Sequence, residues 1–151
     1  MRDYVKLPDR HKRLLQGFTT GVEFTEKEQA IPAYILGAWL GDGHSATTAL
    51  TSMDKELVAA WYDYAAPLNL KVRISTNNSS GKAKTYHITS GKANGHSNRN
   101  PLMNELRTLN LIQNKHIPFN YKTGSSQQRL ELLAGLIDTD GHRSGETFFL
   151  S

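Results

Sequence analysis

Two segments of the sequence repeat one pattern, in which small residues lie four positions apart and an Asp-Gly pair follows. The first copy spans residues 36–43 and the second spans residues 134–141. Their small residues are Gly37, Gly41, Gly135 and Thr139. Positions four apart lie on one face of a helix, and small side chains there let two backbones approach closely. We therefore expect two helices that pack on each other through these four residues.

Each of these helices would end at an aspartate, Asp42 or Asp140. If the helices run parallel, both carboxylates lie at C-terminal ends, where the helix dipole is negative and like charges repel. A divalent cation offsets this charge, and hard oxygen ligands suit Mg²⁺. We predict that Asp42 and Asp140 are metal ligands and catalytic residues, with Mg²⁺ as cofactor and phosphodiester hydrolysis as the reaction. The alternatives are two aspartates that face water, or an acid-base pair that acts on sugars.

The other elements that we expect complete an α+β fold. Helices are expected over 9–16, 31–41, 54–66, 102–111 and 129–139, an extended connector over 18–24, and β-prone segments over 47–52, 71–76, 84–89 and 147–150. A capping-box pattern, Thr25 to Glu28, precedes the second of these helices. The two segments 71–76 and 84–89 alternate with period two around a Gly-containing loop, which predicts a hairpin.

Composition excludes several classes of site. The 151 residues suit one domain with a real core, and the absence of cysteine excludes thiolate zinc sites, cysteine nucleophiles and iron-sulfur clusters. The longest apolar run, 31–40, is too short to cross a bilayer, so no membrane partner is expected. The N-terminus has no secretory signal, which favours an intracellular setting.

Six basic residues cluster on and around the expected hairpin: Lys71, Arg73, Lys82, Lys84, Lys92 and Arg99. No acidic residue occurs between Asp63 and Glu105, and the net charge is +4. Such a cluster can neutralise phosphates, so we predict that these six residues contact double-stranded DNA. A solvated strand face is the alternative.

The sequence LAGLIDTDG at 133–141 resembles the motif that names the LAGLIDADG homing endonucleases, and ILGAWLGDG at 35–43 is similar to the first-copy variant found in inteins. Lys115-His116-Ile117-Pro118 resembles a block that precedes the second motif helix in intein endonucleases. By this resemblance Lys115 lies near the scissile phosphate and is catalytic, polarising the nucleophilic water or stabilising charge in the transition state. A plain surface lysine is the alternative.

The resemblance covers roughly Gly17 to Gly141. It implies an intein-like leader over 1–30 and an endonuclease domain over 31–151, built as one αββαββα half plus the second motif helix. The C-terminal half is expected to be absent, since only ten residues follow Gly141.

The function implied by the resemblance is a site-specific, divalent-metal-dependent, intein-derived DNA homing endonuclease, located in the nucleus if the source is eukaryotic. Its partners would be double-stranded DNA and a host protein flanking the intein, and dimerisation stays open. The alternatives are a truncated or decayed fragment that binds DNA at most, and a maturase-like RNA-binding role.

Overall fold

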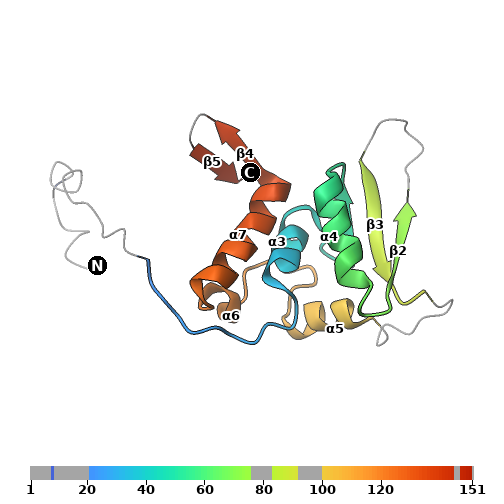
Figure 1. Cartoon of the computed structure of the whole chain (residues 1–151), viewed down its shortest axis with the longest axis horizontal. Coiled ribbons are helices and arrows are strands. Elements are labelled where there is room, and N and C mark those ends of the chain that lie inside the picture. Colours follow the sequence, from blue (N-terminus) through green and yellow to red (C-terminus); the bar gives the residue numbers. More distant parts are fainter. Residues whose placement is uncertain (1–7, 9–20, 76–82, 92–99, 145–146, 151) are drawn as a thin grey trace.

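The computed structural model describes residue 8 and residues 21–75, 83–91, 100–144 and 147–150, with the backbone alone for 142–144 and 147–150 (Figure 1). Its helices are α3 (Ala33–Asp42), α4 (Lys55–Ala65), α5 (Pro101–Thr108), α6 (Phe119–Lys122) and α7 (Ser126–Asp140). Its strands are β1 (Ala49–Ser52), β2 (Lys71–Ser75), β3 (Lys84–Thr89), β4 (Gly141–Ser144) and β5 (Thr147–Leu150). The α+β class is as predicted. The expected helix over 9–16 lies outside the described residues, and no described helix is long and apolar enough to cross a bilayer.

Helix α3 occupies the centre of the fold, with α7 on one side and α4 on the other (Figure 1). Leu36, Ala38 and Trp39 on this helix are completely buried. A helix that is apolar on all sides must be covered on all sides, because each exposed apolar face would remain in contact with water. The central position of α3 therefore follows from its apolar sequence.

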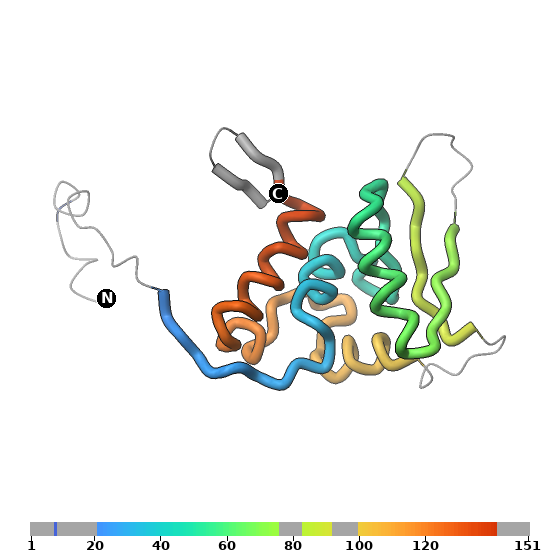
Figure 2. Tube along the Cα trace, in the orientation of Figure 1, coloured from blue at the N-terminus to red at the C-terminus, as the bar shows by residue number. Residues whose placement is uncertain are grey.

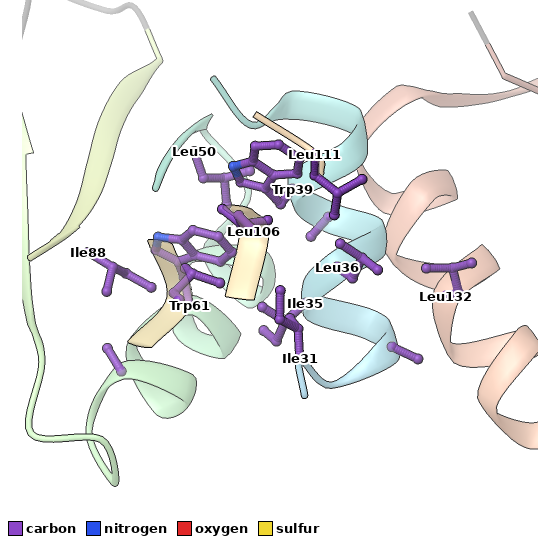
Figure 3. Close-up of a cluster of buried hydrophobic side chains, with 14 of the residues drawn as sticks. Ile31, Ile35, Leu36, Trp39, Leu50, Trp61, Ile88, Leu106, Leu111 and Leu132 are labelled. Atoms are coloured by element: carbon purple, nitrogen blue, oxygen red, sulfur yellow. The ribbon is translucent and has the colours of Figure 1, made fainter. Parts of the chain in front are cut away.

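The core on the α4 side of α3 is built around two buried tryptophans, Trp39 and Trp61. Figure 3 shows Trp61 next to Leu106 and facing Ile88, while Leu132 lies on the α7 side of α3. Burying large aromatic side chains removes 150–250 Å² of surface each by general estimate, so this pair dominates the local packing energy. Trp61 lies on the inner face of α4, as do Leu57 and Ala65.

Three antiparallel strands form the main sheet in the order β1-β3-β2. The expected hairpin is confirmed, because β2 pairs with β3 and places Arg73 opposite His87. Strand β1 joins the other edge of β3 and places Ala49 opposite His87. The αββαββα half predicted two strands between its first helices, but a single strand, β1, lies between α3 and α4. That detail of the prediction is wrong for the described residues.

The segment before α3 is extended, although its capping-box pattern at Thr25 predicted a helix start. The Lys27 backbone N–H donates to Gln128 Oε1 at 3.0 Å, and Gln128 Nε2 donates to the Lys27 carbonyl at 2.6 Å. Figure 2 shows this segment passing beneath α7 before it enters α3. The capping box forms instead in α7, between Ser125 and Gln128, so one glutamine both caps a helix and holds the leader.

Replacing Gly135 by alanine tests the close packing of α3 and α7. A Cβ at Gly135 would overlap the Tyr34 carbonyl oxygen, which is backbone and cannot turn away. Alanine raises helix propensity by about 1 kcal/mol, but overpacking typically costs about 1–3 kcal/mol and moves both helices. We expect Gly135→Ala to lower the free energy of unfolding, measured by urea denaturation.

Gly21→Ala is the matched control, because a Cβ there meets no atom within 4 Å. Its effect should stay within about 0.5 kcal/mol. If Gly135→Ala proved as stable as the native chain, the close packing would be wrong.

Candidate metal centre at the paired helix ends

Helices α3 and α7 contact each other through their glycines in a reciprocal way. A Cβ on Gly37 would overlap the Leu132 carbonyl, and a Cβ on Gly135 would overlap the Tyr34 carbonyl. Leu132 lies three positions before Gly135, and Tyr34 lies three positions before Gly37, so each helix makes the same contact with the other. The helices run in the same direction (Figure 2) and are related by a local two-fold axis.

This parallel packing brings Asp42 and Asp140 to one end of the helix pair, because each is the last helical residue. A Cβ on Gly41 would overlap the Thr139 hydroxyl and lie 3.4 Å from Asp140 Oδ2. The Asp140 carboxylate therefore lies against the last turn of α3, one residue from Asp42. Thr139 Oγ1 is engaged within α7, with the Gly135 and Leu136 carbonyls each at 3.0 Å.

The environment of Asp42 disfavours its charged form. Partial burial raises the pKa of Asp42, the Asp140 carboxylate raises it further, and Lys115 opposes the shift. The C-terminal end of a helix adds negative potential of its own. The structure thus places an acidic group where negative charge accumulates, which is the electrostatic condition that a bound cation relieves.

Lys115 lies at the same helix end. Its Nζ donates to the carbonyls of Leu40 at 3.1 Å, Gly41 at 3.0 Å and Gly43 at 2.5 Å. It also lies 5.3 Å from the ring centroid of Trp39. Partial burial lowers the pKa of Lys115, while Asp140 and Asp42 oppose that shift. Two carboxylates and one ammonium group therefore share this site.

Oxygen donors of this kind fit Mg²⁺, which keeps several waters and takes few protein carboxylates. Within the described residues, no group of three or more His, Asp or Glu side chains could hold a metal ion. If a cation binds at this helix end, Asp42 and Asp140 would be its protein ligands, and water or a substrate phosphate would complete the shell. The absence of a side chain at Gly41 leaves room for Thr139, so the last turns of the two helices, which carry both aspartates, lie close together.

Tyr34 and Asp138 form a cross-helix contact that sequence reasoning missed. Tyr34 Oη donates to Asp138 Oδ2 at 2.8 Å. Burial, and then this bond, raise the pKa of Tyr34 well above its ordinary value. Asp138 is exposed, and this bond links α7 to α3. Because Asp138 is two positions before Asp140, it lies on a different face of α7. A tyrosine just before the first motif copy and an extra aspartate within the second copy were its only sequence signal.

The predicted DNA-contacting residues do not all share one surface. Lys71 and Arg73 are exposed on β2. Lys84 lies on the other face of the sheet. It is on β3 two and four positions from Tyr86 and Ile88, so the three share a face, and Ile88 on that face is buried. Lys82, Lys92 and Arg99 lie outside the described residues. Lys84 therefore lies on the face opposite to Lys71 and Arg73, since strand residues alternate between faces, and its contact with DNA stays a prediction.

The face of the sheet that carries Lys71 and Arg73 also carries a hydrogen-bonded row that sequence reasoning missed. His44 Nε2 lies 3.1 Å from Thr51 Oγ1, which lies 2.9 Å from Thr85 Oγ1. His87 Nε2 lies 3.0 Å from Ser75 Oγ. Burial, then His44 and Arg73, lower the pKa of His87. The His44–Thr51–Thr85 contacts connect the loop after Asp42 to this face of the sheet. They can be recognised only once the pairing of β1 with β3 is known.

Replacing Asp42 by asparagine tests the electrostatics of the site. Because its pKa is higher in the folded than in the unfolded chain, the folded state binds more protons, and stability falls as the pH rises through these two pKa values. Asparagine resembles the neutral acid. We expect Asp42→Asn to raise the melting temperature at pH 7 in chelator, and the gain to shrink near pH 3.

Asp63→Asn, on the exposed side of α4, controls for the loss of one negative charge. Thermal denaturation at both pH values makes the comparison. A lower melting temperature for Asp42→Asn at pH 7 would contradict the repulsive site.

Comparison with known proteins finds a similarity to a DNA helicase. The chain is 38% identical over 120 residues to the replicative DNA helicase DnaB of Mycobacterium intracellulare. The match covers 80% of this chain but 16% of the relative, so the chain corresponds to a small part of that protein. No family model matches the chain.

These comparisons correct the family assignment made from residues 35–43 and 133–141. The prediction that the chain belongs to the LAGLIDADG homing endonucleases is wrong, because no family model matches and the similarity is to a replicative DNA helicase. Two short motifs constrain the packing of one helix pair, and family membership requires agreement along the rest of the chain as well.

Proposed function

We propose that this chain is a site-specific, divalent-metal-dependent endonuclease that hydrolyses phosphodiester bonds of double-stranded DNA. The observation that carries the proposal is the meeting of Asp42 and Asp140 at one end of two parallel helices, with Lys115 beside them. Ordinary packing does not favour two carboxylates at the negative ends of two helix dipoles. A cation-binding role explains why both are there.

Residues of the two helices would bind the metal and set the spacing of its ligands. Asp42 and Asp140 would hold Mg²⁺, which when bound supplies Lewis acidity toward a phosphoryl oxygen and a bound water. Gly37 and Gly135 fix the distance between the two helices, and Gly41 leaves room for the Thr139 side chain next to Asp140. The carboxylates are therefore placed before metal or DNA arrives, which reduces the cost of organising the site.

The outer face of the sheet is the proposed DNA surface. Lys71 and Arg73 supply positive charge there, and Thr51, Thr85 and His87 supply hydrogen-bonding groups. Phosphates are bound by such cations, and base edges are read by such hydrogen-bonding side chains. The row from His44 to Thr85 leads from this face to the turn that follows Asp42, so a duplex on the sheet would extend toward the metal centre.

DNA binding without cleavage is a second candidate, and one observation favours it. In the alignment of the two motif copies, Leu133 of α7 corresponds to Ile35 of α3. Ile35 is buried, whereas Leu133 is 42% exposed and Leu130 is 60% exposed. On the side away from α7, α3 is packed against α4 and the core. Within the described residues, no element packs in the same way on the side of α7 that carries Leu130 and Leu133. A site supported on one side could bind DNA and still fail to hold the reacting phosphate.

We further propose that the matched segment of the helicase relative is an inserted protein-splicing element. Unwinding a duplex has no step that hydrolyses its backbone, so a phosphodiesterase unit inside a helicase chain is best explained as an insertion. The relative should then be processed to a shorter helicase when it is expressed. A full-length product with the segment retained would overturn the insertion while leaving the nuclease proposal standing.

Replacing Asp140 by asparagine tests the metal and the reaction together. We expect Asp140→Asn and Asp42→Asn each to weaken Mn²⁺ binding by at least about tenfold, because loss of even an outer-shell partner costs about 10–100-fold in affinity. Electron paramagnetic resonance titration of free Mn²⁺ measures this. Nicking of plasmid DNA in Mg²⁺ should disappear in Asp140→Asn while DNA binding is retained.

Asp63→Asn is the control, with Mn²⁺ binding and nicking like the native chain. Nicking by Asp140→Asn would remove the assigned role. Hydrolysis that survives chelation would instead favour an acid-base carboxylate pair, and DNA binding with no nicking by the native chain would favour the second candidate.

Neutralising Lys71 and Arg73 tests the DNA surface. Each phosphate contact contributes about 0.9 to the slope of log K against log salt. The double variant Lys71→Gln, Arg73→Gln should therefore reduce the slope by about two in fluorescence anisotropy with duplex DNA. Lys55→Gln together with Arg107→Gln removes two exposed cations from α4 and α5 as a control, and an equal loss of slope there would contradict the assigned face.

A further inference from the structure

We infer that Lys115 is a positioning residue, which fixes the turn after α3 and so the placement of Asp42, and that it carries no proton in the reaction. This inference rests on the proposed function for its catalytic consequence. The geometry that supports it, however, is present in the chain without metal or DNA.

The Lys115 ammonium group has three N–H donors, and three backbone carbonyls accept from it. They belong to Leu40, Gly41 and Gly43, and these residues bracket Asp42 on both sides. The last carbonyls of a helix have no partner within the helix. Lys115 supplies those partners from 72 to 75 residues away in the sequence. It also places a positive charge at the negative end of the α3 dipole.

The same segment holds the turn at a second point. The Gln113 backbone N–H donates to the Ser45 carbonyl at 2.8 Å. Gln113 has φ 55°, a conformation that is uncommon for a residue with a side chain. Trp39 Nε1 donates to the Thr47 carbonyl at 2.9 Å from the helix side. The turn is thus held from both sides, and Lys115 is the contact nearest to Asp42.

The end of α7 is supported differently, which explains why α3 needs the lysine. Helix α7 continues directly into β4, and the pairing of Gly141 with Leu150 in β5 fixes the backbone after Asp140. After Asp42 there is an isolated bridge between Gly43 and Leu50 and then a turn. Without Lys115, the peptide groups on both sides of Asp42 would lose three hydrogen bonds and gain freedom to rotate.

A proton-carrying role is inconsistent with these contacts. To take a proton from water, Nζ would first have to lose one of the protons that it donates to a carbonyl. To reach a phosphate, it would have to leave several carbonyls and the face of the Trp39 ring. Each move would release the turn that places Asp42.

Three substitutions at position 115 separate positioning from proton transfer. Arginine keeps a positive charge and several donors but cannot act as a base, because its pKa is too high. Glutamine keeps two donors without charge, and methionine keeps neither. Positioning predicts activity in the order Lys, Arg, Gln, Met, with Lys115→Arg retaining about a tenth or more of native nicking. Proton transfer predicts that Lys115→Arg is as inactive as Lys115→Met.

Amide hydrogen exchange provides a readout that does not depend on cleavage. The Gly43 and His44 N–H groups donate to the Trp39 and Ala49 carbonyls. Exchange at these two amides should be about tenfold faster in Lys115→Met and within about threefold of native in Lys115→Arg. Exchange at Val58 in α4 should not change, which shows that the variant is folded. Lys122→Met, at an exposed lysine of α6, is the matched control.

Unchanged exchange in Lys115→Met would overturn the inference. So would an inactive Lys115→Arg whose turn keeps native protection. If the native chain binds no metal and cuts no DNA, the proposed function fails, and the exchange experiment still decides whether Lys115 holds the turn.

Discussion

The close approach of the α3 and α7 backbones is the constraint on which the rest of the site depends. Gly37 and Gly135 each face a carbonyl oxygen of the opposite helix, and no side chain fits between them. This contact sets the two helices parallel and in register, so their C-terminal residues, Asp42 and Asp140, arrive together. Neither aspartate is placed by its own contacts alone; the glycines deeper in the interface place both.

The sequence predicted the elements whose signals are local. Asp54 was expected to begin α4, and its Oδ1 accepts from the Glu56 and Leu57 N–H groups. Prediction from sequence failed where a residue far away in the chain determines the local conformation. The Thr25 pattern fits a helix start, but Gln128 binds the backbone there and keeps it extended. The contacts of Lys115 and the pairing of β1 with β3 also join positions far apart in the chain, and no window of sequence contains both partners.

The candidate site shows the same division. The small residues and the Asp-Gly pairs were sufficient to expect paired helices with two carboxylates at one end. They were not sufficient to identify a family, because a few positions at one interface determine local packing, whereas the similarity to DnaB extends over 120 residues. The backbone contacts of Lys115 were also beyond the sequence, since a lysine that donates to helix-end carbonyls and a lysine that faces a phosphate look the same until its three carbonyl partners are known.

The central claim is that one cation is shared by Asp42 and Asp140. Anomalous diffraction from crystals of the chain grown with Mn²⁺ measures this directly, since the ion can be located without reference to protein atoms. We expect one peak at the paired helix ends, within about 2.0–2.6 Å of a carboxylate oxygen from each aspartate, by analogy with the hard cations. A peak bound by one aspartate alone, or ordered helix ends with no peak between them, would contradict it.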